Sequence, residues 1–229
     1  MRKEVKTLAL IGIIIVLAAV FGATYYRESV QSERRAVGTT DGPLVRPDSP
    51  TLGPETAPVT LVEFLDPECE SCRAFSPTVK QILKDYDGRV RLVVRYMPLH
   101  PNSLLAAAFT EAAGEQGRYW EMQEMLFRRQ PEWGERHGHG EPGHGEPEVR
   151  PSAPPAVLFE KYAMELGLDV ERIKTAVAQN RYSAKLERDR QDGQSLGVTR
   201  TPTFFVNGRL LARFSEEDLR ALIDEELKR

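Results

Sequence analysis

Two cysteines separated by two residues are the only thiols in the chain of 229 residues: they form the stretch Cys69-Glu70-Ser71-Cys72. A thiolate is the nucleophile in disulfide exchange, and the free amides and partial positive charge of a helix N-terminus lower the pKa of a thiol placed there. The spacing brings both sulfur atoms to one side of a first helical turn. We therefore predict that Cys69 is the exposed nucleophile and Cys72 the shielded second thiol.

Three other interpretations of the pair carry less weight. Zinc would need further ligands, and the only clustered complement is His137, His139 and His144, in a stretch rich in Gly, Pro and Glu that is more simply a surface loop. A structural disulfide between residues three apart would close a tiny loop and gain little entropy. Chance is a poor account of both cysteines falling at one junction between a strand and a helix.

The elements around the pair form a recognisable order. Residues 59–65 are a nearly continuous apolar run typical of a buried strand, residues 73–86 have apolar residues at helical spacing, and residues 89–97 alternate like a second strand. Strand, helix and strand over about forty residues make a βαβ unit. The cysteine pair directly follows the first strand and begins the helix.

The rest of the chain is helical, followed by a hairpin. Helical patterns cover 103–128, 156–167 and 169 to about 196, and 130–155 is a loop. Strands are predicted at Thr203–Val206 and Arg209–Phe214 on either side of Asn207-Gly208, which is the strongest short hairpin signal. Ser215, with Asp218 three residues later, begins a final amphipathic helix to Leu227.

Over about residues 55–229 the chain resembles the thioredoxin superfamily, and within it the DsbA-like thiol-disulfide oxidoreductases. Besides the cysteine pair, the resemblance rests on Glu63 in the strand before it, on Pro202 in the Gly197–Phe204 loop, and on Pro77 in the active-site helix. It implies an α/β thioredoxin fold with a helical domain inserted at about 99–196. A carboxylate in an apolar strand is costly without a role or a partner, although a solvated edge position is the alternative for Glu63.

The resemblance also implies roles for particular residues. Glu63 is expected to shuttle the proton of Cys72, and Pro202 to lie in the cis form against the cysteine pair. The backbone of Thr201 is expected to pair with an extended substrate peptide, which Glu70 and Ser71 between the cysteines would also contact.

Two features depart from the family pattern. The dipeptide between the cysteines lacks the proline or histidine often found there, and the carboxylates of Asp66, Glu68 and Glu70 crowd the nucleophile. Because like charge disfavours a thiolate, we predict that Cys69 is less acidic, and the protein a milder oxidant, than strongly oxidising family members.

The N-terminal segment points to the membrane. Leu8–Ala23 carries no charge, and Thr7–Tyr26 is long enough to span a bilayer, so residues 1–27 are predicted to be an anchor, with a cleavable signal as the alternative. Residues 28–54 are predicted to be a flexible linker. We therefore expect a single-pass protein of the cell membrane, with its catalytic domain in the periplasm or outside the cell.

Composition excludes several classes of protein. A formal net charge of -3 gives no electrostatic case for binding nucleic acid, and a mean hydropathy of -0.42 excludes several membrane spans. The function that we expect is the introduction of disulfides into thiol-bearing exported proteins, without a bound cofactor. The resemblance implies a membrane protein that reoxidises the pair. A disulfide reductase or isomerase, and a copper metallochaperone using the cysteines and the histidine loop, remain open alternatives.

Overall fold

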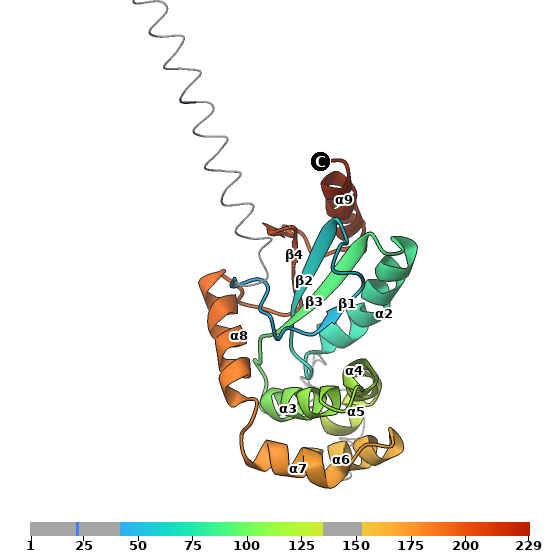
Figure 1. Ribbon diagram of the computed structural model, residues 1–229, viewed down its shortest axis with the longest axis vertical. Coiled ribbons are helices and arrows are strands. Elements are labelled where there is room, and N and C mark those ends of the chain that lie inside the picture. Colours follow the sequence, from blue (N-terminus) through green and yellow to red (C-terminus); the bar gives the residue numbers. More distant parts are fainter. Residues whose placement is uncertain (1–21, 23–41, 135–152) are drawn as a thin grey trace, which may run out of the picture.

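A five-stranded mixed sheet lies at the centre of the protein (Figure 1). The computed structural model describes residue 22 and residues 42–134 and 153–229. The strands run in the order β1-β3-β2-β4-β5, with β2 parallel to β3 and antiparallel to β4. Their bounds are Thr51–Leu52 for β1, Val59–Leu65 for β2, Val90–Tyr96 for β3, Thr203–Val206 for β4 and Arg209–Leu210 for β5.

The helices fall into three groups. α2 (Glu70–Asp85) and α9 (Glu216–Leu227) flank the sheet, and α8 (Ser183–Ser195) lies along its opposite face (Figure 1). Beyond the end of the sheet lie α3 (Ser103–Gly114), α4 (Tyr119–Arg128), α5 (Gln130–Trp133), α6 (Pro155–Glu165) and α7 (Val170–Ala178). The predicted thioredoxin fold with a helical insertion is thus confirmed.

The alternation of side chains along β2 separates two hydrophobic cores. Leu61 and Leu65 belong to the larger core, which α2, α9 and the helical insertion share. Val62 and Phe64 belong to the smaller core on the other face, which α8 covers. Successive residues of a strand point to opposite faces, so the pattern assigns Glu63 to the face that carries α2.

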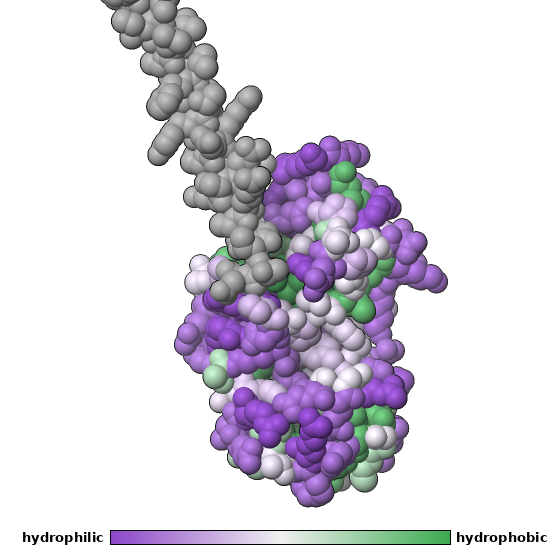
Figure 2. All heavy atoms as spheres, in the orientation of Figure 1, coloured by the Kyte–Doolittle hydropathy of each residue, from purple (hydrophilic) through white to green (hydrophobic). Residues whose placement is uncertain are grey.

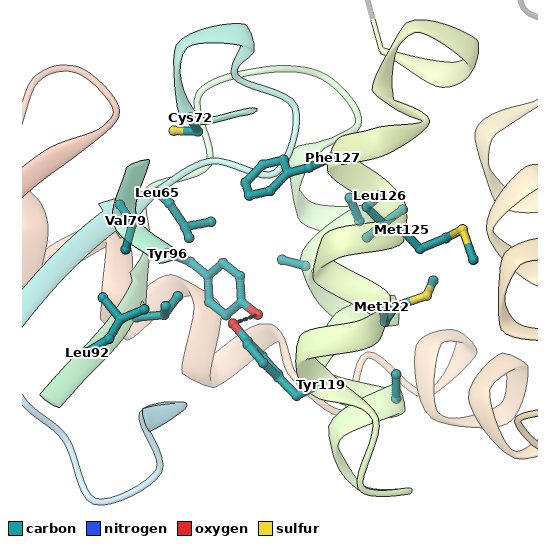
Figure 3. Packing of buried hydrophobic residues seen from close by; sticks show 14 of the residues in the cluster. Leu65, Cys72, Val79, Leu92, Tyr96, Tyr119, Met122, Met125, Leu126 and Phe127 are labelled. Atoms are coloured by element: carbon teal, nitrogen blue, oxygen red, sulfur yellow. Dashed lines mark hydrogen bonds between the residues drawn. The ribbon is translucent and has the colours of Figure 1, made fainter. Parts of the chain in front are cut away.

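Two buried tyrosines connect the sheet to the helical insertion. Figure 3 shows the side chains of Tyr96, at the end of β3, and Tyr119, at the start of α4, with their hydroxyl groups pointing toward each other among apolar side chains. Their oxygen atoms are 2.8 Å apart. The insertion therefore shares one core with the sheet rather than forming a separate body.

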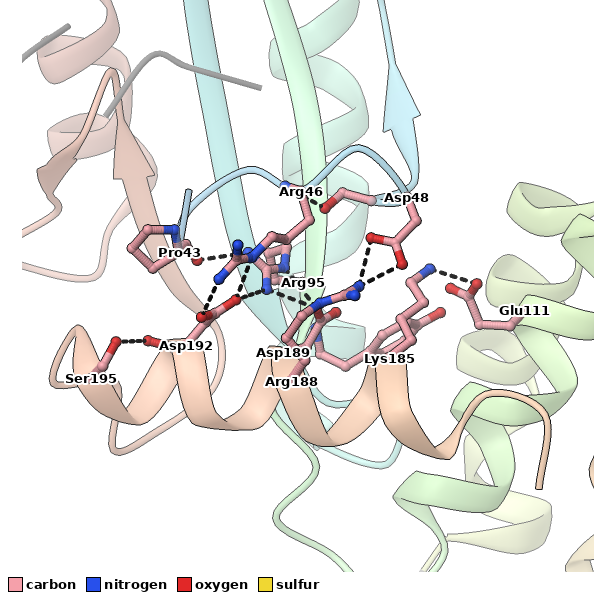
Figure 4. Close-up of polar contacts among 12 residues, drawn as sticks. Pro43, Arg46, Asp48, Arg95, Glu111, Lys185, Arg188, Asp189, Asp192 and Ser195 are labelled. Atoms are coloured by element: carbon pink, nitrogen blue, oxygen red, sulfur yellow. Dashed lines mark hydrogen bonds and ion pairs between the residues drawn. The ribbon is translucent and has the colours of Figure 1, made fainter. Parts of the chain in front are cut away.

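The N-terminal side of the described chain is held on the sheet. Residues 42–54 lie within the stretch expected to be linker, yet Leu44 and Val45 are buried and the amide of Val94 donates to the carbonyl of Pro50. β1 then pairs with β3. Figure 4 shows this segment, which we call the strap (residues 42–50), crossing above α8. Residues 42–54 are thus part of the folded unit together with the residues from 55 onward.

Several predicted elements are shorter than expected. The stretch 103–128 contains two helices, because the chain turns at Gly117, whose φ of +75° suits glycine, and the stretch 169–196 is interrupted after α7. The predicted strand Arg209–Phe214 ends at Leu210, after which the chain leaves the sheet.

The surface of the described residues is mainly hydrophilic on the side shown in Figure 2, with small separate hydrophobic areas. Within the described part of the chain, no helix is both long and apolar enough to cross a membrane. The anchor predicted at residues 1–27 lies outside the described residues except for Gly22.

Candidate active site

The two cysteines lie where the chain leaves β2 and begins α2. Cys69 caps the N-terminus of α2, and Cys72 lies in its first turn. Both thiols are free, and Cys69 is 8% exposed while Cys72 is 0% exposed. The geometry therefore distinguishes an outer thiol from an inner one.

The outer thiol is acidic. The pKa of Cys69 is lowered to about 5, chiefly by a hydrogen bond from the Cys72 thiol. Burial opposes this change, whereas Thr201 and the backbone amides of Ser71 and Cys72 lower the pKa further. Donors at a helix N-terminus favour the thiolate. Cys69 is consequently a thiolate at neutral pH.

The inner thiol has the opposite character. The pKa of Cys72 is raised well above its ordinary value, first by burial, then by its hydrogen bond with Cys69 and by the charges of Cys69 and Glu63. Cys72 therefore keeps its proton until a base removes it. Stepwise disulfide exchange requires this asymmetry: one thiol is ionised and nucleophilic, and the second stays protonated until a base activates it.

Glu63 is placed to act as that base. It lies in the middle of the sheet on the face that α2 covers, is 4% exposed, and is not at a solvated edge. Burial first, and the negative charge of Cys69 second, raise the pKa of Glu63 to about 8. A carboxyl with this pKa exchanges its proton near neutral pH.

A small cavity gives Glu63 a connection to water. It has a volume of about 70 Å³, lies between α2 and α4, and is lined by Glu63, Ser76, Lys80 and Gln123 among others. Such a space holds a water molecule, since roughly 10–15 Å³ of probe-occupied volume is enough for one. The side-chain oxygen of Gln123 is buried without a hydrogen-bond partner among the described residues, so it offers an acceptor there.

The loop before β4 lies against the outer thiol. The peptide bond between Thr201 and Pro202 is cis, as expected from the resemblance, and the Cys69 sulfur lies 3.3 Å from the Thr201 carbonyl oxygen. A groove of about 540 Å³ runs beside this contact, between the loop and the segment that follows β5. Its lining includes Ser71, Thr201, Pro202 and the half-exposed ring of Phe214.

The residues between the cysteines, Glu70 and Ser71, are exposed at the start of α2, and Ser71 borders the groove. Their predicted contact with substrate stays a prediction. The carboxylates of Asp66 and Glu68 are buried and hydrogen-bonded to the segment before α3. They do not prevent the fall in the pKa of Cys69, and whether the protein is a milder oxidant than its relatives stays open to measurement.

Gln130 holds the active-site loop, a role that the sequence does not predict. Its side-chain nitrogen donates to the carbonyls of Pro67 and Cys69 at 3.0 and 3.1 Å, and its oxygen accepts from Arg73 at 2.9 Å. Gln130 begins α5, so the helical insertion fixes the N-terminus of α2. A single glutamine far away in sequence gives no local signal for this contact.

His100 is a second residue near the site that the sequence analysis does not single out. Its Nδ1 lies 2.7 Å from the carboxylate of Asp66, in the loop that leads to Cys69.

The described residues contain no group of three or more His, Cys, Asp or Glu side chains suited to a metal ion. His137, His139 and His144 lie outside the described residues.

Comparison with known proteins places this site in a family. Residues 46–225 match the Thioredoxin family. The chain belongs to the thioredoxin family. Its likeness to a solved structure is consistent with that: the crystal structure of oxidised BdbD from Bacillus subtilis superposes with a TM-score of 0.65 at 26% identity, covering 79% of this chain and 94% of BdbD.

Two curated relatives each match more than two thirds of this thioredoxin family member. Disulfide bond formation protein D of Bacillus subtilis is 27% identical over 78% of this chain and 77% of its own length. The Na(+)/H(+) antiporter NhaA 3 of Salinispora tropica is 38% identical over 160 residues, which are 69% of this chain. The chain spans only 21% of that antiporter's length. The resemblance to DsbA-like oxidoreductases predicted from the cysteine pair is confirmed.

Proposed function

We propose that the protein is a thiol-disulfide oxidoreductase that donates its Cys69–Cys72 disulfide to exported proteins. The observation that carries this proposal is the pair itself: an outer thiol with a pKa of about 5 beside the cis-proline loop, and a buried thiol with a raised pKa. Stabilising the Cys69 thiolate stabilises the reduced form, which makes the disulfide a better oxidant.

The reaction uses each part of the site. A client thiolate attacks the outer sulfur, that of Cys69, in the disulfide, and the Cys72 thiolate leaves. Cys72 then takes up a proton, with Glu63 and the cavity water as its route. A second client thiolate attacks the client sulfur of the mixed disulfide, and Cys69 departs as a stable thiolate. Two electrons pass from the client to the pair.

The groove beside Pro202 is where we place the client peptide. Its lining includes Phe214 and Thr201, and the carbonyl oxygen of Thr201 lies 3.3 Å from the Cys69 sulfur. An extended peptide there would lie alongside the cis-proline loop as an added strand.

The reduction potential of the folded domain, residues 42–229, tests the proposed direction. Equilibration with glutathione buffers should give a value between about -120 and -180 mV. A value near about -270 mV would mark a reductase and overturn the proposal. In parallel, the oxidised protein should convert a reduced two-cysteine peptide to its disulfide. Cys69→Ser should be inactive, whereas Ser183→Ala, exposed at the start of α8 and outside the groove, should keep the activity.

We further propose that residues 1–27 anchor the protein in the cell membrane with the catalytic domain outside, where a membrane protein reoxidises it. The uncharged run Leu8–Ala23 supports the anchor. The full chain should sediment with membranes. After intact cells are treated with a reductant that does not cross membranes, Cys69 should react with a thiol reagent that does not cross them either. Labelling only after lysis would contradict the orientation.

A further inference from the structure

The loop that leads to Cys69 is joined to the segment between β3 and α3 through Asp66. This side chain is 0% exposed and accepts hydrogen bonds from the amides of Glu68 and Leu99, from the Ser103 hydroxyl and from His100. The backbone carbonyl of the same residue accepts from the Cys69 amide at 3.1 Å. One buried residue thus contacts both the imidazole ring and the nucleophile.

His100 is fixed in this arrangement and still reaches water. Its backbone amide donates to the Ser103 hydroxyl at 3.2 Å, its ring is 2.7 Å from Asp66, and its side chain is 20% exposed. The ring can therefore gain or lose a proton without a change in the fold. A histidine held by a carboxylate at a partly exposed position is suited to such a change near neutral pH.

The charges that face His100 are negative. Asp66, Glu68 and Cys69 approach from the active-site loop, whereas α3 and the residue before it contribute the uncharged groups of Ser103 and Asn102. Burial lowers the pKa of His100, but the hydrogen bond and charge of Asp66, followed by the charges of Cys69 and Glu68, raise it overall. The thiolate and the imidazolium thus stabilise each other.

We propose that His100, held by Asp66, is a positioning residue that binds a proton more tightly when Cys69 is a thiolate than when Cys69 is in the disulfide. This inference rests on the proposed function. Reduction by a client dithiol leaves a Cys69 thiolate and a Cys72 thiol, so one of the two client protons stays on Cys72. The other proton is released, and His100 binds part of it. The redox state of the pair is therefore coupled to the charge of His100.

Coupling of this kind is reciprocal, which makes it measurable from both sides. The imidazole pKa of His100, followed by NMR in the full protein, should be higher in the reduced than in the oxidised form. His100→Gln assigns its signal among those of the other three histidines. We expect a difference of about threefold or more in proton affinity. The ultraviolet absorbance of the thiolate should show that His100→Gln weakens the acidity of Cys69 by a similar factor.

Two variants separate this charge effect from a loss of structure. His100→Lys keeps a cation and should restore most of the acidity of Cys69. Asn102→Ala removes a hydrogen bond that a neutral amide group in the same segment donates to the Glu68 carboxylate. It should leave the acidity of Cys69 unchanged. Equal His100 pKa values in both redox states, or an equal effect of Asn102→Ala and His100→Gln, would overturn the inference. Failure to oxidise the two-cysteine peptide would count against the proposed function alone.

Discussion

Two buried ionisable residues lie on neighbouring strands of the sheet and face opposite ways. Phe64 of β2 pairs with Arg95 of β3, and Glu63 is the residue before Phe64. Arg95 is 0% exposed and donates to Asp189, to Asp192 and to the carbonyl of Pro43, as Figure 4 shows. Glu63 is nearly as buried, but its carboxyl has no hydrogen bond to another described residue.

This difference separates structure from chemistry. Arg95 is paired with two carboxylates, and it fastens the strap and α8 to the sheet. Only burial and the charge of Cys69 favour the protonated form of Glu63, and they raise its pKa to about 8. At that pKa the carboxyl can gain and lose its proton near neutral pH. The paired face supports the fold, whereas the unpaired carboxyl is the one that we propose serves the reaction.

The largest effect should come from breaking the paired face. Arg95→Met keeps much of the side-chain volume but leaves Asp189 and Asp192 buried without their shared partner, so it should cost about 4 kcal/mol in the free energy of unfolding. Urea unfolding of the oxidised protein at pH 7 measures this cost. A loss below about 1 kcal/mol would show that Arg95 does not hold the strap and α8 as we describe.

Glu63→Gln should change stability in the opposite direction. In the oxidised protein the Cys69 charge is absent, but burial still raises the pKa of Glu63 above the unfolded value of 4.5, so stability should fall as pH rises above that value. The variant should lack this fall and should be more stable at pH 7 by up to roughly 3 kcal/mol. Oxidised protein, unfolded in urea at pH 4.5 and pH 7, keeps the free thiols out of the measurement.

The functional cost of Glu63→Gln distinguishes its role from simple destabilisation. If Glu63 carries the Cys72 proton, the stabilised variant should oxidise the two-cysteine peptide about tenfold more slowly or worse. A variant that is both more stable and fully active would show that the unpaired carboxyl is not used.

A smaller effect should follow from a neutral buried contact. Tyr96→Phe removes one hydroxyl of the pair with Tyr119 and leaves the other buried (Figure 3), which should cost about 1 to 2 kcal/mol. Neither phenol titrates between pH 4.5 and pH 7, but the Tyr96 hydroxyl also favours the ionised form of the buried Glu111 carboxyl, whose pKa is raised. The cost of Tyr96→Phe should therefore grow as pH rises, whereas Glu63→Gln becomes more stabilising. The same urea series checks both.

Local patterns were enough to predict the centre of the site. Cys69 and Cys72 at the end of an apolar run, Glu63 within that run and Pro202 before a second strand are visible over short stretches of sequence. They predicted the fold because strand and helix periods are local, and because the cysteine pair needs a helix N-terminus.

What supports the site was not predictable in this way. Arg95 and Asp189 are 94 residues apart, and the contacts of Gln130 with the active-site loop span more than 60 residues. An arginine in a strand, or a glutamine that begins a short helix, reads as an exposed residue. The strap was taken for linker for the same reason, since its two buried residues, Leu44 and Val45, show no period of their own.

The smallest effect is expected at an exposed ion pair that joins the same elements as the buried ion pairs of Arg95. Arg188 of α8 pairs with Asp48 of the strap at 2.6 Å, joining the same two elements that Arg95 joins, but both side chains are about half exposed. Water and salt screen such a pair, so Asp48→Ala should cost less than about 0.5 kcal/mol, and less again in 0.5 M salt. A cost comparable with that of Arg95→Met would mean that the contact between strap and α8, rather than burial of the charge, sets the energy of this face.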